Sequence, residues 1–293
     1  MLAETQKHAE NTQKQHQFAS FDLRALTPHM GAEIHGLDLS QPLDDHQSRD
    51  LDAAFRNWMV LVFRDQELSR EQHKAFGRRF GKLHSHPMHK VGLRGDDPEI
   101  LPVVTTADSP YTAGDGWHTD VTCDPIPPLG SILYLSEMPE SGGGDTLFAN
   151  MALAYELLSP PIQQFLGGLN AVHDGAKPYI GAYKSEPPEG GYPTSEHPVI
   201  TRHPESGARV LYVNSGFTTH LCGLASHESS SLLSMLFDHI ANTPRIHCRV
   251  RWEPKTVTLW DNRCTQHHAI WDYYPHSRRG ERVSVCGEDP PRA

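Results

Sequence analysis

Two short stretches, Gly116–Thr122 and Trp260–Ala269, constrain the fold of this chain most, because the chemistry of each is complete only if the fold brings them together. The first stretch contains a His-x-Asp triplet. Alternate side chains of an extended segment share a face, so we expect His118 and Asp120 to point the same way. An imidazole and a carboxylate side by side suit a divalent transition metal, and a second histidine would complete a set of two histidines and one carboxylate.

The triplet by itself is not specific. A His-x-Asp triplet is expected about once by chance in a chain with 20 histidines, and such a pair can equally be a helix cap or an ion pair. The second stretch contains the adjacent residues His267 and His268, either of which could supply the missing ligand. A facial set of this kind leaves coordination positions open for a cosubstrate and for oxygen.

Length and charge limit the class of protein. The chain has 293 residues and a net charge of -10, without a dense run of Lys or Arg. This balance argues against a nucleic acid or an anionic membrane as partner. The stretch 1–17 is polar and lacks apolar periodicity, so we expect a disordered leader followed by a single domain over 18–293.

The location of the protein is predicted from what the sequence lacks. No apolar run has the length of a membrane span, and the N-terminus has no signal-peptide core. The 5 cysteines are scattered and have no C-x-x-C spacing, which suits a reducing compartment. We therefore expect a cytoplasmic protein.

Hydrophobic periodicity predicts a mixed sequence of helices and strands. A capping box formed by Ser69 and Gln72 should open a helix that ends near Gly81. The glycine-rich turn at 141–147 is interpreted as a tight hairpin. Further helices are expected at 44–57, 151–158, 161–166 and 226–241, and strands at 31–37, 58–63, 99–106, 130–137, 170–174, 197–203, 209–213, 248–252 and 257–260.

Two segments are interpreted as loops. The stretch 175–197 is rich in Gly, Pro, Tyr and Glu without periodicity, so it is either disordered or an active-site lid, and its position between core strands favours a lid. The histidine-dense segment 83–89 could be a metal site of its own or a loop whose histidines serve as hydrogen-bond partners. The loop is favoured because no Cys, Asp or Glu accompanies these histidines.

The second stretch continues through Arg278 and Arg282 to Val285, and together with Trp-His-Thr-Asp (117–120) it closely resembles the iron(II)- and 2-oxoglutarate-dependent dioxygenases of the taurine dioxygenase type. The resemblance runs from about Leu26 to Pro290. It implies a mixed α/β, mainly β fold whose core is a double-stranded β-helix, a cupin-like jelly roll, with flanking helices. Its other motifs are Phe-Arg-Asp-Gln (63–66), Arg-Phe-Gly-Lys-Leu-His-Ser-His-Pro (79–87), Gly-Gly-Asp-Thr (143–146) and Val-Asn-Ser-Gly-Phe-Thr-Thr (213–219).

The resemblance assigns roles to particular residues. It implies that His118, Asp120 and His267 bind Fe(II), and that His268 stands beside the ligand position. Thr146 and Arg278 would bind the far carboxylate of the cosubstrate 2-oxoglutarate, a group that the fork of a guanidinium matches well.

The resemblance also defines a substrate pocket. Arg282 would bind the acidic head group, and because it lies four residues after Arg278, both should face one cavity from one strand. His89, Gly114 and Tyr179 depart from taurine dioxygenase, which has Tyr, Asn and Phe there, so we expect a substrate tail different from that of taurine. The substrate-facing residues implied are His86, His89, Val121, Tyr179, Phe217 and Arg282.

The implied reaction consumes O2, converts 2-oxoglutarate to succinate and CO2, and hydroxylates a small anionic substrate such as a taurine-like sulfonate or related acid. Alternative substrates are an alkyl sulfate, an aryloxy acid or another carboxylate. Two other classes remain: a non-catalytic jelly roll that binds metal or 2-oxoglutarate, and a metal-assisted hydrolase. The presence of Thr146, Arg278 and Arg282 argues against both. The resemblance further implies a homo-oligomer, either a dimer or a tetramer.

Overall fold

A computed structural model describes residues 18–86 and 97–293, so the predicted leader at 1–17 and the candidate substrate residue His89 lie outside the described residues. The largest element of the fold is a seven-stranded sheet. Its neighbouring strands are antiparallel, except that β2 and β3 run parallel. In spatial order the strands are β1 (Asp22–Ala25), β2 (Ala32–His35), β3 (Val60–Phe63), β13 (Thr256–Asp261), β5 (Gly130–Glu137), β15 (Arg278–Val285) and β4 (Leu101–Thr105).

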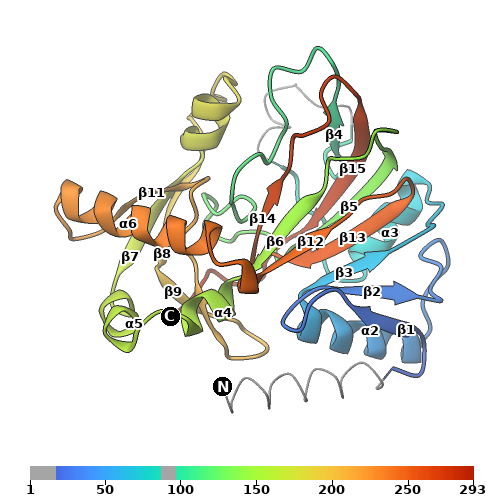
Figure 1. The fold of residues 1–293 in the computed structure, drawn as a ribbon, viewed down its shortest axis with the longest axis horizontal. Coiled ribbons are helices and arrows are strands. Elements are labelled where there is room, and N and C mark those ends of the chain that lie inside the picture. The colour runs from blue at the N-terminus through green and yellow to red at the C-terminus, as the bar shows by residue number, and fades with distance from the viewer. Residues whose placement is uncertain (1–17, 87–96) are drawn as a thin grey trace.

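A three-stranded sheet packs against one face of the larger sheet. It contains β12 (His247–Val250), β6 (Thr146–Asn150) and β14 (Thr265–Ala269), in that order. Val62 and Leu135 of the larger sheet share one apolar cluster with Phe148 and Val250 of the smaller sheet. Two facing, mainly antiparallel sheets with an apolar interior are the jelly-roll arrangement, which confirms the predicted mainly β fold (Figure 1).

The opposite face of the larger sheet is covered by two helices, α2 (Asp45–Trp58) and α3 (Arg70–Arg78). Both begin with a capping box, in which Asp44 pairs with Gln47 and Ser69 pairs with Gln72. The predicted strand at 58–63 begins later than expected, because Trp58 still belongs to α2.

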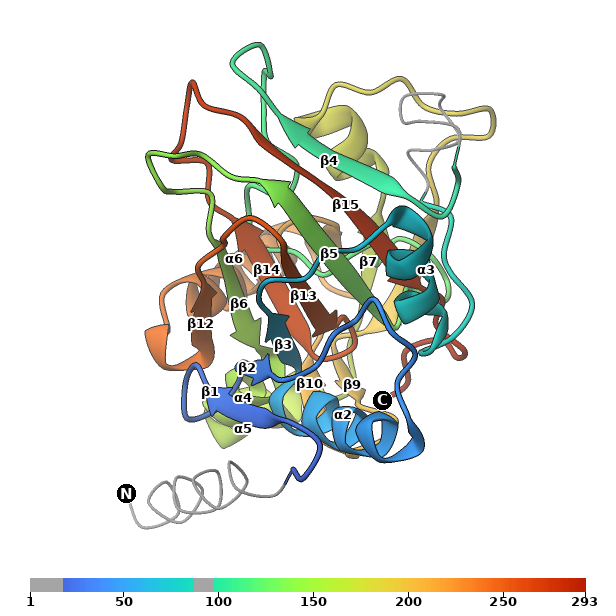
Figure 2. The same cartoon turned by 90° about the vertical axis from the view of Figure 1, so that its right-hand side faces the viewer.

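A third layer flanks the barrel; it stands on the left in Figure 1 and lies behind the barrel in the view of Figure 2. Its apolar residues form a separate cluster. The strands expected at 197–203 and 209–213 form a hairpin, since β9 (Ile200–Arg202) and β10 (Arg209–Leu211) pair antiparallel. The elements of this layer are α4 (Met151–Glu156), α5 (Pro160–Leu166), β7 (Asn170–Asp174), η2 (Lys177–Ala182), β8 (Thr194–Pro198), β9 (Ile200–Arg202), β10 (Arg209–Leu211), β11 (Thr218–Leu221), α6 (Ser226–Ala241) and η3 (Pro244–Ile246).

The glycine-rich turn at 141–147 does not form the hairpin expected from the sequence. The strand before it, β5, belongs to the seven-stranded sheet, whereas the strand after it, β6, belongs to the three-stranded sheet. Gly142, Gly143 and Gly144 all have positive φ, which lets the chain cross from one sheet to the other within a few residues. Thr146, at the start of β6, is thereby placed at the mouth of the barrel.

None of the helices in the described part of the chain combines the length and apolarity needed to cross a bilayer.

Candidate active site

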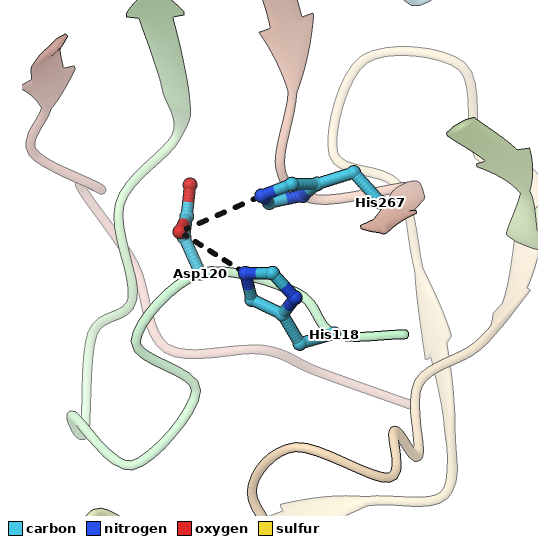
Figure 3. A group of neighbouring side chains, drawn as sticks. All are labelled: His118, Asp120 and His267. Carbon is cyan, nitrogen blue, oxygen red and sulfur yellow. Dashed lines mark ion pairs between the residues drawn. The ribbon is translucent and has the colours of Figure 1, made fainter. Parts of the chain in front are cut away.

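His118, Asp120 and His267 converge at one end of the barrel (Figure 3). His267 lies on β14, and a pair of backbone hydrogen bonds of 2.8 and 3.0 Å joins it to His118, which adds one residue to the edge of the three-stranded sheet. Asp120 follows in a turn rather than in the extended segment that the sequence suggested. Its side chain nevertheless points to the same side as that of His118.

The donor atoms of these three side chains surround a small space. Oδ1 of Asp120 lies 3.9 Å from Nε2 of His118 and 3.9 Å from Nε2 of His267. All three donor atoms lie within 4.8 Å of one another, close enough to be ligands of one ion. Two imidazoles and one carboxylate are the donor set of non-haem iron oxygenases, so the residues present fit the metal that the resemblance implies.

The ring nitrogens of the two histidines are in the state that metal binding needs. Nδ1 of His118 donates to the carbonyl of Gly116 at 2.8 Å, which leaves the lone pair on Nε2. Burial lowers the pKa of His118, and it lowers that of His267 further, with the neighbouring His118 contributing. Both imidazoles are therefore neutral near pH 7, as metal ligation requires.

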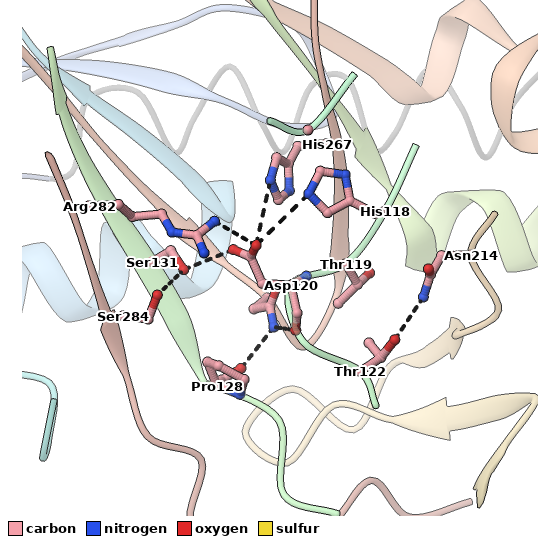
Figure 4. Close-up of polar contacts among 12 residues, drawn as sticks. His118, Thr119, Asp120, Thr122, Pro128, Ser131, Asn214, His267, Arg282 and Ser284 are labelled. Atoms are coloured by element: carbon pink, nitrogen blue, oxygen red, sulfur yellow. Dashed lines mark hydrogen bonds and ion pairs between the residues drawn. The ribbon is translucent and has the colours of Figure 1, made fainter. Parts of the chain in front are cut away.

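Asp120 is held by contacts to both of its carboxylate oxygens (Figure 4). Nη1 of Arg282 donates to Oδ1 at 2.6 Å, and the hydroxyl of Ser131 donates to Oδ2 at 2.9 Å. Burial, the largest single effect, would raise the pKa of Asp120. The charge of Arg282, together with smaller effects of the two imidazoles and of the Ser131 hydrogen bond, outweighs it, and the pKa falls below its ordinary value. The carboxylate is therefore ionised. Neither Arg282 as a partner of Asp120 nor Ser131 was foreseen from the sequence, because both contacts depend on the pairing of β5 with β15.

Of the two adjacent histidines, only His267 faces Asp120. His268 points to the other side of β14, where its Nε2 lies 3.0 Å from Oδ1 of Asp115. Alternation along a strand explains the difference, since successive side chains point to opposite faces.

Thr146 and Arg278 lie together in the same cavity, where both are buried. The guanidinium carbon of Arg278 lies 5.6 Å from the ring centre of Trp252, and Nε1 of Trp252 donates to the Thr146 hydroxyl at 2.9 Å. Nε and Nη2 of Arg278 have no hydrogen-bond partner among the described residues. A buried cation with two unused donors fits a carboxylate, which is the group that 2-oxoglutarate would place there. Trp252 has no motif that would have identified it from the sequence.

The cavity that contains these residues has a volume of about 340 Å³. Of the substrate-facing residues expected from the resemblance, five line it, namely His86, Val121, Tyr179, Phe217 and Arg282.

The segment interpreted as a lid forms one wall of this cavity. Lys177, Tyr179 and Tyr183, on or next to η2, are among the lining residues. The Tyr183 hydroxyl accepts a hydrogen bond of 3.0 Å from the backbone N–H of Gly114, and the Tyr183 ring stacks on Tyr111 with ring centres 4.9 Å apart. The wall is thus attached directly to the loop that leads to His118.

A second group of metal-ligand types, His203, Asp261 and Cys264, is buried near the start of β14. Both oxygens of Asp261 are already used, because Arg263 donates to each of them and His203 lies 3.0 Å from Oδ2. This arrangement is an ion-pair network that closes the loop between β13 and β14.

Comparisons with known proteins agree with the geometry. The sequence pattern of the family described as "Taurine catabolism dioxygenase TauD, TfdA family" matches residues 22–286. An alpha-ketoglutarate-dependent sulfonate dioxygenase of Saccharomyces cerevisiae is 32% identical over 92% of this chain and 67% of its own length. An alpha-ketoglutarate-dependent sulfate ester dioxygenase of Pseudomonas putida is 34% identical over 92% of this chain and 90% of its own length.

A solved structure gives the same result. The crystal structure of a taurine dioxygenase from Burkholderia xenovorans superposes with a TM-score of 0.79 and 36% identity, covering 92% of each chain. The match of the family pattern extends over nearly the whole described chain. This chain belongs to the TauD, TfdA family of dioxygenases, as the resemblance of its motifs predicted.

Proposed function

We propose that this dioxygenase binds Fe(II) through His118, Asp120 and His267, and that it uses 2-oxoglutarate and O2 to hydroxylate a small anionic substrate. The proposed substrate is a sulfonate or a sulfate ester, with succinate and CO2 as coproducts. One observation carries the proposal: a set of three metal-ligand side chains and the buried guanidinium of Arg278 lie in the same cavity, and two donors of that guanidinium have no partner among the described residues.

Each residue has a distinct task in this mechanism. When bound, the iron and 2-oxoglutarate supply the oxidising chemistry. Asp120 and the two imidazoles hold the ion, and the hydrogen bonds from Ser131 and to Gly116 orient two of these ligands.

The two arginines bind the two organic anions. Arg278 and Thr146 orient the cosubstrate by its far carboxylate. Arg282 binds the anionic head of the substrate, and through its contact with Asp120 it places that head next to the metal ligands. Substrate and metal site are therefore positioned by one side chain.

The cavity wall supports a substrate with an apolar tail. Leu101, Val103 and Leu133 line the cavity. Among the described lining residues only Asp115 and Asp120 carry a carboxylate, and these are paired with His268 and Arg282. An ammonium group such as that of taurine would find no available acidic partner there, and burying an unpaired charge is costly. We therefore propose an alkyl or aryl tail.

The experiment that tests the function is succinate formation from 2-oxoglutarate in air by the iron(II)-loaded protein. Taurine, hexanesulfonate, hexyl sulfate and a phenoxy acid are offered separately, and sulfite or sulfate release is measured in the same samples. We expect hexanesulfonate or hexyl sulfate to raise succinate formation well above the rate without substrate, and taurine to raise it less.

Other outcomes identify the competing classes. Turnover that continues without oxygen would indicate a hydrolase. If 2-oxoglutarate binds but no anion in a broad panel raises succinate formation, the chain is a non-catalytic binding protein. Taurine turning over as fast as hexanesulfonate would refute the proposed apolar tail.

We also propose that the protein is cytoplasmic and forms a dimer or tetramer, as the family resemblance implies. All five cysteines are free thiols, which suits a reducing compartment. Sedimentation equilibrium measures the oligomeric state, and a monomer at micromolar concentration would contradict that part of the proposal.

A further inference from the structure

The hydroxyl group of Tyr179 has no use in the mechanism above. Tyr179 lies on η2 with only 3% of its surface exposed. Its ring is held by aromatic neighbours, with ring centres 4.7 Å from Tyr192, 5.8 Å from His86 and 5.9 Å from Phe217. Its hydroxyl has no hydrogen-bond partner in the part of the chain that the structure describes. A buried polar group without a partner is rare in folded proteins and indicates either a ligand or bound water.

A ligand that pairs with the Tyr179 hydroxyl would lie on the substrate side of the cavity. Tyr179 and Arg282 both line the cavity, and Nε of Arg282 is likewise without a partner among the described residues. Nη1 of Arg282 is already bound to Asp120. Two unused donors, one charged and one neutral, are thus available in one cavity next to the metal ligands.

The electrostatic surroundings keep Tyr179 a donor. Burial raises the pKa of Tyr179 well above its ordinary value, and the nearby charges of Arg282 and Asp120 have opposing, smaller effects. The phenol therefore remains protonated across the working pH range. A protonated phenol can donate to an anionic oxygen.

We propose that the Tyr179 hydroxyl donates a hydrogen bond to the head group of the substrate, and that it is a specificity-determining residue for heads with three terminal oxygens. A carboxylate can place both of its oxygens on one edge of a guanidinium. A sulfonate or sulfate ester has a third terminal oxygen, which needs a further donor. Tyr179 supplies that donor on the lid, so it favours sulfur oxyanions over carboxylates. This inference rests on the proposed function, and in particular on the head group binding at Arg282.

The Tyr179 hydroxyl is not needed to hold the ring in place. The aromatic contacts with Tyr192, His86 and Phe217 need only the ring. The added hydroxyl does not contribute to that packing, and it carries a desolvation cost unless a ligand pairs with it. Discrimination through a buried donor is large, since a ligand that cannot pair with it leaves the donor unsatisfied.

The test compares Tyr179→Phe with the wild type by calorimetric titration of the iron(II) and 2-oxoglutarate complex without oxygen. Hexyl sulfate is the sulfur oxyanion probe and heptanoate is the carboxylate probe. A hydrogen bond to a charged group contributes enough for a loss of roughly ten-fold or more in affinity. We expect this loss for hexyl sulfate, and a loss of less than about three-fold for heptanoate, so that the preference for the sulfate collapses.

Tyr192→Phe is the matched control. The Tyr192 ring contacts that of Tyr179 in a tilted arrangement, but its own hydroxyl donates to the carbonyl of Glu186 at 3.1 Å, and Tyr192 is not among the described residues that line the cavity. It should leave the ratio of the two affinities unchanged. Thermal unfolding of both variants shows whether the ring packing is retained.

The outcomes separate this inference from the proposed function. Unchanged hexyl sulfate affinity in Tyr179→Phe, or equal losses for both probes, would overturn the role of Tyr179, while wild-type succinate formation would still support the proposed function. A wild type that binds neither probe would overturn both.

Discussion

At the scale of single residues, Oδ1 of Asp120 is the centre of the site. It faces the two imidazoles at 3.9 Å each and accepts from Arg282 at 2.6 Å. An ionised carboxylate oxygen has more than one lone pair, so it can serve a metal and a guanidinium at once. In the proposed mechanism, metal binding and substrate binding are therefore coupled through one atom.

The first prediction concerns the two adjacent histidines. His267→Ala should lower iron(II) affinity by more than about 100-fold and abolish succinate formation, because it removes one of three donors. His268→Ala removes only the contact with Asp115 and should keep the metal. Iron content after dialysis against a weak chelator measures both, and the reverse pattern would show that His268 is the ligand.

The second prediction assigns a different ligand to each of the two arginines. Arg278→Gln should raise the KM for 2-oxoglutarate by roughly ten-fold or more, since it removes the charge that pairs with the carboxylate. Arg282→Gln should raise the KM for the sulfur oxyanion instead. Both constants are measured for each variant at matched iron content. Equal effects of one variant on both ligands would refute this division of roles.

At the scale of elements, Arg278 and Arg282 lie on one face of β15 because the alternation of side chains along this strand is uninterrupted. The pairing of β15 with β5 shifts register between Arg279 and Gly280, where Arg279 pairs with Glu137 and Gly280 with Leu135. The extra residue is therefore Ser136 on β5, and Arg278 and Arg282 keep the same face of β15. The sequence prediction of a shared face is confirmed for this reason.

The close approach of β15 to β5 at this point requires a glycine. A Cβ on Gly280 would lie 2.2 Å from the carbonyl oxygen of Tyr134. Any side chain there would push β15 away from β5 and displace the arginines on either side of it.

The third prediction concerns the attachment of the lid element. Tyr183→Phe removes the hydrogen bond from Gly114 N–H but keeps the stacking on Tyr111. A neutral hydrogen bond of this kind corresponds to roughly two- to ten-fold in an equilibrium constant. We expect the KM for substrate to rise by about that factor, and amide hydrogen exchange at 177–183 to become faster.

Tyr274→Phe serves as the control for the lid, because Tyr274 is 66% exposed and is not among the described residues that line the cavity. An unchanged exchange rate in Tyr183→Phe would mean that the stacking on Tyr111 alone holds the wall in place.

At the scale of the whole molecule, buried histidines outside the site make stability depend on pH. Burial lowers the pKa of His73 to about 4 and that of His173 to about 3. In the unfolded chain both return to about 6.5. Between these values the unfolded state binds more protons than the folded state, so stability is complete above about pH 6.5 and falls as the pH is lowered.

The fourth prediction follows from this difference. The free energy of unfolding in urea should be lower at pH 5 than at pH 7, by on the order of 2 kcal/mol for each of these histidines. His73→Gln should reduce that dependence, whereas His46→Gln, at an exposed position on α2, should leave it unchanged. Stability that is equal at the two pH values would contradict the prediction.

The sequence by itself was enough to predict the features that depend on neighbouring residues or on residue type. The capping box at Ser69 and the helix at 226–241 follow from spacing along the chain, and the structure confirms them. The motifs around His118 and Arg278 were enough to identify the family, because together they supply the residue types that its chemistry needs, and the family pattern matches residues 22–286.

The tertiary structure alone decided the features that depend on which strands meet and in which register. Pairing of β14 with the segment at His118 brings His267 and not His268 to Asp120. The crossing at 142–144 separates two strands that the sequence suggested were a hairpin. The contacts of Ser131 with Asp120 and of Trp252 with Thr146 likewise join segments distant in the chain. The Tyr179 hydroxyl is buried by such packing and has no partner among the described residues. No local pattern encodes such contacts, because their energies arise only after the sheets have packed.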